Sequence, residues 1–174
     1  DFTAVSVREK SGVDICKNTF KYDKVVHVLD PTMIIGKEFY QEKIIKKYNE
    51  TETNKGGLLS YVLDEVEEKK KIIEFVQKNS GLKNLNHLKG FDTSNTTYTL
   101  PKWVASFANA DFVVTDSFHG MVFSIIFEKE FVVIGNHSRG LDRFISLLGL
   151  LELKDRLVFD VKDLEGKEIK KIDY

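Results

Sequence analysis

The sequence predicts an α/β protein with a Rossmann-like, doubly wound and mostly parallel sheet. Short apolar runs rich in β-branched residues alternate with amphipathic stretches along all 174 residues. Such alternation is typical of crossover connections between parallel strands, with helices on both faces of the sheet. The composition, 42% hydrophobic and 30% charged, is that of an ordinary globular protein. No apolar run reaches the roughly 18 residues that a membrane span requires.

In the first part of the chain, turn signals separate the expected elements. The segment "FTAVSV" is rich in β-forming residues. "KVVHVL" is closed by "DPT", in which Asp30 is interpreted as a turn residue. A polar stretch with a glycine pair, residues 51–57, predicts a loop or an inter-domain hinge. The expected elements are a strand over 2–7, a helix over 11–19, a strand over 24–29 and a helix over 38–49.

From residue 58 onward the alternation is more regular. Asp64 is expected to cap one helix and Gly81 to end it, while Pro101 suits the start of the next. "EEKKK", residues 67–71, is interpreted as a solvated helix face. We expect strands over 58–63, 85–90, 111–116, 130–135 and 156–161, helices over 64–79, 100–110, 117–129 and 140–150, and a polar loop over 91–99.

Domain organisation is predicted as a single Rossmann-like domain over 1–174. The start at "DFTAVSVREK" without Met indicates a fragment of a longer protein. Alternatively, residues 1–50 are the tail of a preceding domain, and 57–174 form a separate C-terminal domain.

Charge and composition exclude several functions. The net charge of −1, from 26 basic and 27 acidic residues, argues against nucleic acid as the main partner. The single cysteine excludes an internal disulfide. His27 and His87 lack metal-ligand spacing with any other histidine, so we expect no metal site.

The strongest functional signal is "TDSFHG", where a strand passes into a very apolar helix. Free amides at the start of a helix favour phosphate or carboxylate, and His119 would lie beside such a ligand. Gly120 lacks a Cβ and lets a ligand or another part of the chain approach closely. The alternative is that His119 is a hydrogen-bonded structural residue. The residues of N-cap type here are Thr115, Asp116 and Ser117.

At these residues the chain closely resembles the polysaccharide pyruvyl transferase family. The resemblance is strongest over 101–156, through "ADFVVTDSFHG", the apolar helix, "FVVI", "RG…RF.SLL" and the closing Asp155-Arg156. Upstream, "SVREKSG" (6–12) and "VLDPTMII" (28–35) are similar to segments of that family in the same order. The resemblance therefore covers most of the chain.

This resemblance implies an enzyme that transfers a pyruvyl group from phosphoenolpyruvate to sugar hydroxyls, forming a ketal in bacterial exopolysaccharide biosynthesis. It also implies the C-terminal half of a GT-B glycosyltransferase fold, so that the chain is a fragment of a larger two-domain enzyme. In the alternative division, residues 57–174 would be its donor-binding domain. The acceptor would be a glycan or lipid-linked sugar, met in the cytoplasm or at the inner membrane face. Phosphoenolpyruvate would be a donor substrate, with no cofactor. Two alternatives are a nucleotide-sugar-dependent glycosyltransferase of GT-B type and a non-catalytic carbohydrate-binding module.

Site residues follow from the resemblance and from the chemistry of an anionic donor. In the family, the histidine and arginine matching His119 and Arg8 are donor-site candidates, and histidine suits acid catalysis near neutral pH. Alternatively, Arg8 pairs with Glu9, Asp116 caps the helix, and Arg143 forms an exposed pair with Asp142. The expected catalytic residues are His119 and Arg8, and the expected substrate-binding residues are Asp116, Ser117, Phe118, Gly120, Arg139 and Arg143.

Overall fold

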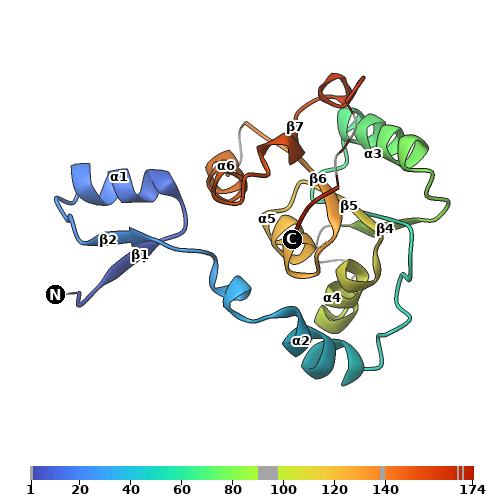
Figure 1. Cartoon of the computed structure of the whole chain (residues 1–174), viewed down its shortest axis with the longest axis horizontal. Helices are drawn as coiled ribbons and strands as arrows, with labels where there is room; N and C mark the ends of the chain where they lie inside the picture. The colour runs from blue at the N-terminus through green and yellow to red at the C-terminus, as the bar shows by residue number, and fades with distance from the viewer. Residues whose placement is uncertain (1, 90–97, 138–139, 168, 170) are drawn as a thin grey trace.

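A five-stranded, all-parallel sheet forms the centre of the molecule, which confirms the predicted α/β class (Figure 1). A computed structural model describes residues 2–89, 98–137, 140–167, 169 and 171–174. The strand order is β4-β3-β5-β6-β7, and each neighbouring pair is parallel. The strands are β3 (Leu58–Val62), β4 (Leu85–Lys89), β5 (Phe112–Thr115), β6 (Glu130–Ile134) and β7 (Leu157–Val158).

Helices cover both faces of this sheet, as a doubly wound fold requires. One hydrophobic core lies under α3, and the other lies between the sheet and α4, α5 and α6. The chain runs from β3 outward to β4 and then returns past β3 to β5, so the winding reverses between β3 and β5. The helices are α3 (Glu67–Ser80), α4 (Leu100–Asn109), α5 (Phe118–Ile126) and α6 (Leu141–Leu150).

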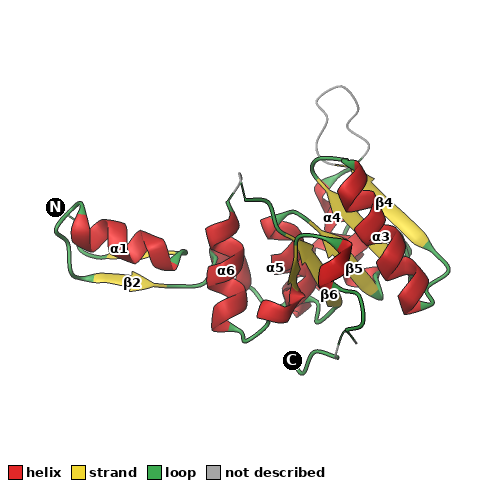
Figure 2. Ribbon diagram, turned by 90° about the horizontal axis from the view of Figure 1, so that it is seen from above, coloured by secondary structure: helices red, strands yellow, loops and turns green. Residues whose placement is uncertain are grey.

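The N-terminal residues form a small unit with its own sheet. It consists of β1 (Val5–Val7), α1 (Lys10–Asn18) and β2 (Val25–His27), with the two strands parallel. Figure 2 shows this unit beside α6. The Lys10 amide donates to Ser146 Oγ at 3.1 Å, and the Ser11 hydroxyl donates to Asp142. Since Glu9 makes no capping bond, α6 supplies an acceptor for the start of α1. The division into domains stays a prediction.

Between the two sheets, the chain turns through three short helical segments. These are η1 (Pro31–Ile34), α2 (Lys37–Phe39) and the π-helical η2 (Tyr40–Lys46). The predicted helix over 38–49 is therefore a short α-helical turn followed by a π-helix. The Tyr40 ring packs edge-on against Phe123 of α5, with 5.0 Å between centroids. Beyond α6 lie η3 (Lys154–Arg156) and η4 (Val161–Asp163).

Several predicted boundaries are wrong. The strand expected over 2–7 is limited to Val5–Val7, because it pairs with one short strand only. The strand expected over 156–161 is limited to Leu157–Val158, which pairs at the sheet edge with the last two residues of β6. Asp64 does not cap α3, whose N-cap is Val66, although Gly81 ends that helix in the left-handed conformation as predicted. The loop expected over 91–99 lies mostly outside the described residues.

Close packing holds the junction between β5 and α5. The Thr115 hydroxyl donates to the Tyr61 carbonyl of β3 at 2.7 Å and accepts from the Ser117 amide at 3.0 Å. A Cβ at Gly120 would lie 2.3 Å from Thr115 Oγ1. Ser117 Oγ accepts from the Gly120 amide at 3.3 Å, so the first turn of α5 is capped and pressed against the strand.

Gly120→Ala tests this packing. We expect the free energy of unfolding to fall by about 1–3 kcal/mol, because the added methyl group overpacks a site with no spare volume. Chemical denaturation measures the loss. In a Thr115→Ala background the same change should cost less. The matched control is Gly149→Ala in α6, where the new Cβ would meet only the flexible end of Lys154 at 3.1 Å. Equal effects of the two glycine substitutions would contradict the packing account.

Candidate functional site

A cavity of about 430 Å³ lies where the N-terminal unit meets the start of α5. Three segments that are far apart in the sequence contribute to it: the end of β1, the turn after β2 and the first turn of α5. It therefore brings together the two residues predicted to be catalytic. The lining residues are Ser6, Arg8, Val28, Asp30, Pro31 and His119.

His119 enters this cavity from the first turn of α5. Its imidazole is exposed and meets the Phe118 ring edge-on, with 5.7 Å between centroids. Of the three residues of N-cap type, Ser117 is the N-cap. Helix geometry leaves the amides of Phe118 and His119 without intrahelical acceptors, and the helix dipole adds partial positive charge there. An exposed imidazole is thus combined with an end of a helix that favours anions.

Arg8 reaches the cavity because β1 and β2 are parallel and end together. Val7 pairs in register with His27, so the residues after each strand meet at the same edge. The Arg8 guanidinium donates to the buried Asp30 carboxylate, while 38% of the Arg8 side chain stays exposed. The distance from Arg8 Nη2 to Glu9 Oε1 is 4.0 Å, so Asp30 rather than Glu9 is the close partner. One side of the guanidinium remains available for a ligand.

Asp30 is fixed in turn by Thr32. The carboxylate accepts from the Thr32 amide at 3.0 Å and from its hydroxyl at 2.7 Å, which caps η1 and confirms the predicted turn role. Burial raises the pKa of the Asp30 carboxyl, but the hydrogen bonds from Thr32 and Arg8 outweigh burial. The net pKa lies below the ordinary value of 3.8, so Asp30 is an anion at neutral pH. Reasoning from the sequence missed its role as the support of Arg8.

Two residues predicted to bind substrate, Asp116 and Gly120, have close structural partners. Asp116 is buried, where its carboxylate accepts from the Leu63 amide at 2.7 Å and pairs with Lys69. It does not cap α5, because Ser117 does. The close approach allowed by Gly120 is made by Thr115 rather than by open space for a ligand.

Of the two arginines predicted after β6, Arg143 is near the site. Its guanidinium carbon lies 5.3 Å from the centroid of the Phe118 ring. Phe118 directly precedes His119 in the chain. The Phe118 ring also packs against Phe144, with 5.9 Å between centroids. Arg143 therefore places a half-buried cation beside the start of α5. Arg139 lies outside the described residues.

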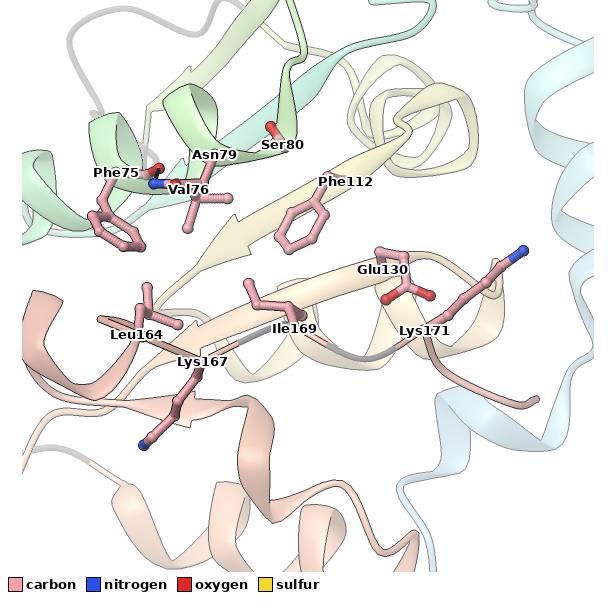
Figure 3. A pocket seen from close by; sticks show the side chains of 11 residues that line it. Phe75, Val76, Asn79, Ser80, Phe112, Glu130, Leu164, Lys167, Ile169 and Lys171 are labelled. Atoms are coloured by element: carbon pink, nitrogen blue, oxygen red, sulfur yellow. Dashed lines mark hydrogen bonds between the residues drawn. The ribbon is translucent and has the colours of Figure 1, made fainter.

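A larger cavity, of about 660 Å³, lies at the opposite end of the sheet (Figure 3). Phe112 and Glu130, the first residues of β5 and β6, line it, whereas His119 follows the last residue of β5. Its other side chains include Phe75, Leu164 and Ile169. None of the predicted site residues that the structure describes contributes to it. Lys167 and Lys171 also line the larger cavity. We place the candidate site in the smaller cavity, because it brings the exposed His119 imidazole and the Arg8 guanidinium to the start of α5.

The comparison with protein families decides the identity. The family model described as polysaccharide pyruvyl transferase matches residues 1–138. The chain belongs to this family. The match includes the segments of Arg8, Asp30 and His119 and ends before α6. Among curated proteins and among solved structures, nothing matches the chain.

Two further observations concern this pyruvyl transferase family member. In the described ranges, no helix is long and apolar enough to cross a membrane. Within the same ranges, no three histidine, cysteine, aspartate or glutamate side chains are grouped as a metal ion would need.

The Asp30 support predicts a pH-dependent contribution to stability. Because the folded pKa is lowered, this contribution is present above the unfolded pKa and is lost as the pH falls through the folded pKa. We expect Asp30→Asn to be less stable than the wild type at pH 6, with the difference shrinking near pH 3. Urea unfolding at both pH values measures it. Asp23→Asn, at an exposed position of the same unit, is the control. If the stability difference between Asp30→Asn and the wild type were the same at both pH values, the charge of Asp30 would not be what stabilises the fold.

Proposed function

We propose that this protein transfers a pyruvyl group from phosphoenolpyruvate to two hydroxyls of a glycan or a lipid-linked sugar. The observation that supports this most is the shared cavity of Arg8 and His119 at the start of α5. An exposed imidazole beside a guanidinium and a helix N-terminus suits a ligand that carries both a carboxylate and a phosphate. Family membership supports pyruvyl transfer as the type of reaction.

In the proposed reaction, His119 acts as the general acid. The imidazolium gives a proton to the methylene carbon of phosphoenolpyruvate, which makes the neighbouring carbon electrophilic. One sugar hydroxyl adds to that carbon and gives its proton to the neutral imidazole, which returns to the imidazolium form. A second hydroxyl then adds as the bond to the phosphate oxygen breaks, and its proton leaves with the phosphate. The products are a cyclic pyruvate ketal and inorganic phosphate.

Anion binding in this proposal comes from Arg8, Arg143 and the amides of α5. Arg8 keeps an exposed side while Asp30 fixes its position, and Arg143 is held over the Phe118 ring. Fixed donors of this kind stabilise developing charge without reorganisation, so the reaction needs no metal ion. We further propose a GT-B-like arrangement, with the acceptor bound opposite the sheet domain. The reaction would take place in the cytoplasm or at the inner membrane face.

Turnover of phosphoenolpyruvate tests the proposal directly. The full-length protein is incubated with phosphoenolpyruvate and candidate sugars, and phosphate release is followed together with the mass of the sugar product. We expect His119→Ala to lower turnover by about 10²–10⁴-fold while the protein stays folded, because it removes the acid. His87→Ala, at an exposed histidine of edge strand β4, is the matched control and should keep full activity. Binding of nucleotide diphosphates but not phosphoenolpyruvate in calorimetry would instead indicate a glycosyltransferase.

A further inference from the structure

Lys69 and Asp116 form a nearly fully buried ion pair that the proposed reaction does not use. Only 9% of the Lys69 side chain and 1% of the Asp116 side chain are exposed. The second carboxylate oxygen of Asp116 accepts from the Leu63 amide at 2.7 Å. Asp64 lies farther from the ammonium, at 3.7 Å, and is about half exposed. Asp116 is therefore the main counter-ion of Lys69. The prediction that residues 67–71 form a solvated face is wrong for Lys69 alone, since the other four residues of this range are exposed.

The pair lies where the winding of the sheet reverses. Leu63 follows β3, Asp116 follows β5, and Lys69 comes from the first turn of α3 on the other face of the sheet. Asp116 also directly precedes Ser117, the N-cap of α5. Asp116 thus lies three residues before His119, which lines the cavity.

An unpaired carboxylate at this position would oppose an anionic ligand. A unit charge about 8 Å from a ligand charge, at an effective dielectric constant near 20, changes affinity on the order of 10- to 30-fold. We propose that Lys69 is a positioning residue that neutralises Asp116 and so keeps the start of α5 able to hold an anion. This inference rests on the proposed function, since it concerns binding of the same donor. In this proposal the two properties of Asp116 have different effects. Its charge acts on the ligand, whereas the hydrogen bond that it accepts from the Leu63 amide fixes the backbone.

Three variants of the full-length protein test the inference: Lys69→Met, Asp116→Asn and the double variant. Calorimetry gives the Kd for phosphoenolpyruvate and for inorganic phosphate, and kinetics give KM and kcat. We expect Lys69→Met to weaken anion binding about 10- to 30-fold and to raise KM more than it lowers kcat. The double variant should return to within about 3-fold of the wild type. Asp116→Asn should bind at least as tightly as the wild type, because Lys69 then adds attraction.

The matched control is Lys70→Met, which removes an exposed lysine of the same helix turn and should leave the Kd within about 2-fold. If Lys69→Met does not fold, Asp116→Asn should still bind anions more tightly than the double variant. The inference is overturned if a folded Lys69→Met keeps the wild-type Kd. It is also overturned if Asp116→Asn and Lys69→Met weaken binding equally. A wild type that binds phosphate without releasing it from phosphoenolpyruvate would refute the proposed function alone.

Discussion

The candidate site depends on the close contact between Thr115 and Gly120. The Thr115 hydroxyl donates a hydrogen bond to the Tyr61 carbonyl of β3 and accepts one from the Ser117 amide. Gly120 has no Cβ, so its Cα packs directly against the Thr115 side chain. This contact sets the direction in which α5 leaves the sheet. With Phe118 buried and Ser117 capping the helix, His119 is the residue of the first turn that is left facing outward. The exposure of the imidazole is thus a consequence of packing behind it.

The N-terminal unit and the turn that follows it supply Arg8 and Asp30 to the site. Parallel pairing of β1 with β2 places Arg8 next to the turn that carries Asp30, and Asp30 is held by Thr32. The unit meets α6 through two exposed hydrogen bonds, from the Lys10 amide and the Ser11 hydroxyl. Contacts of this kind contribute little to stability individually. The position of Arg8 relative to His119 therefore depends more on local bonding around Asp30 than on a large interface.

Much of the fold could be predicted because the strands of the main sheet are buried on both faces. Their apolar runs are continuous, so β3, β5 and β6 were found within one or two residues. The predicted strand lengths are wrong at Val5–Val7 and at Leu157–Val158, where pairing sets the length. Composition does not reveal how many partners a strand has. His119 and Ser117 could be placed because capping and helix phase are local properties.

The remaining site features depend on tertiary pairing. Asp30 looked like a turn residue and is one, but its bond to Arg8 depends on the parallel pairing of two short strands. The burial of Lys69 was not predicted, because the residue stands in a run of three lysines. A signal was present, however, since it lies on one helical stripe with Ile72, Ile73 and Val76, which are buried. A lysine on an apolar stripe indicates a buried partner, and only the fold shows that the partner is Asp116.

A crystal structure of the protein with phosphoenolpyruvate tests the central claim most directly. The account predicts density for the ligand in the cavity lined by Arg8 and His119, with its anionic groups at the guanidinium and the first amides of α5, and with its methylene carbon toward the imidazole. An empty cavity at saturating ligand, or a ligand bound elsewhere with His119 remote from it, would contradict the account.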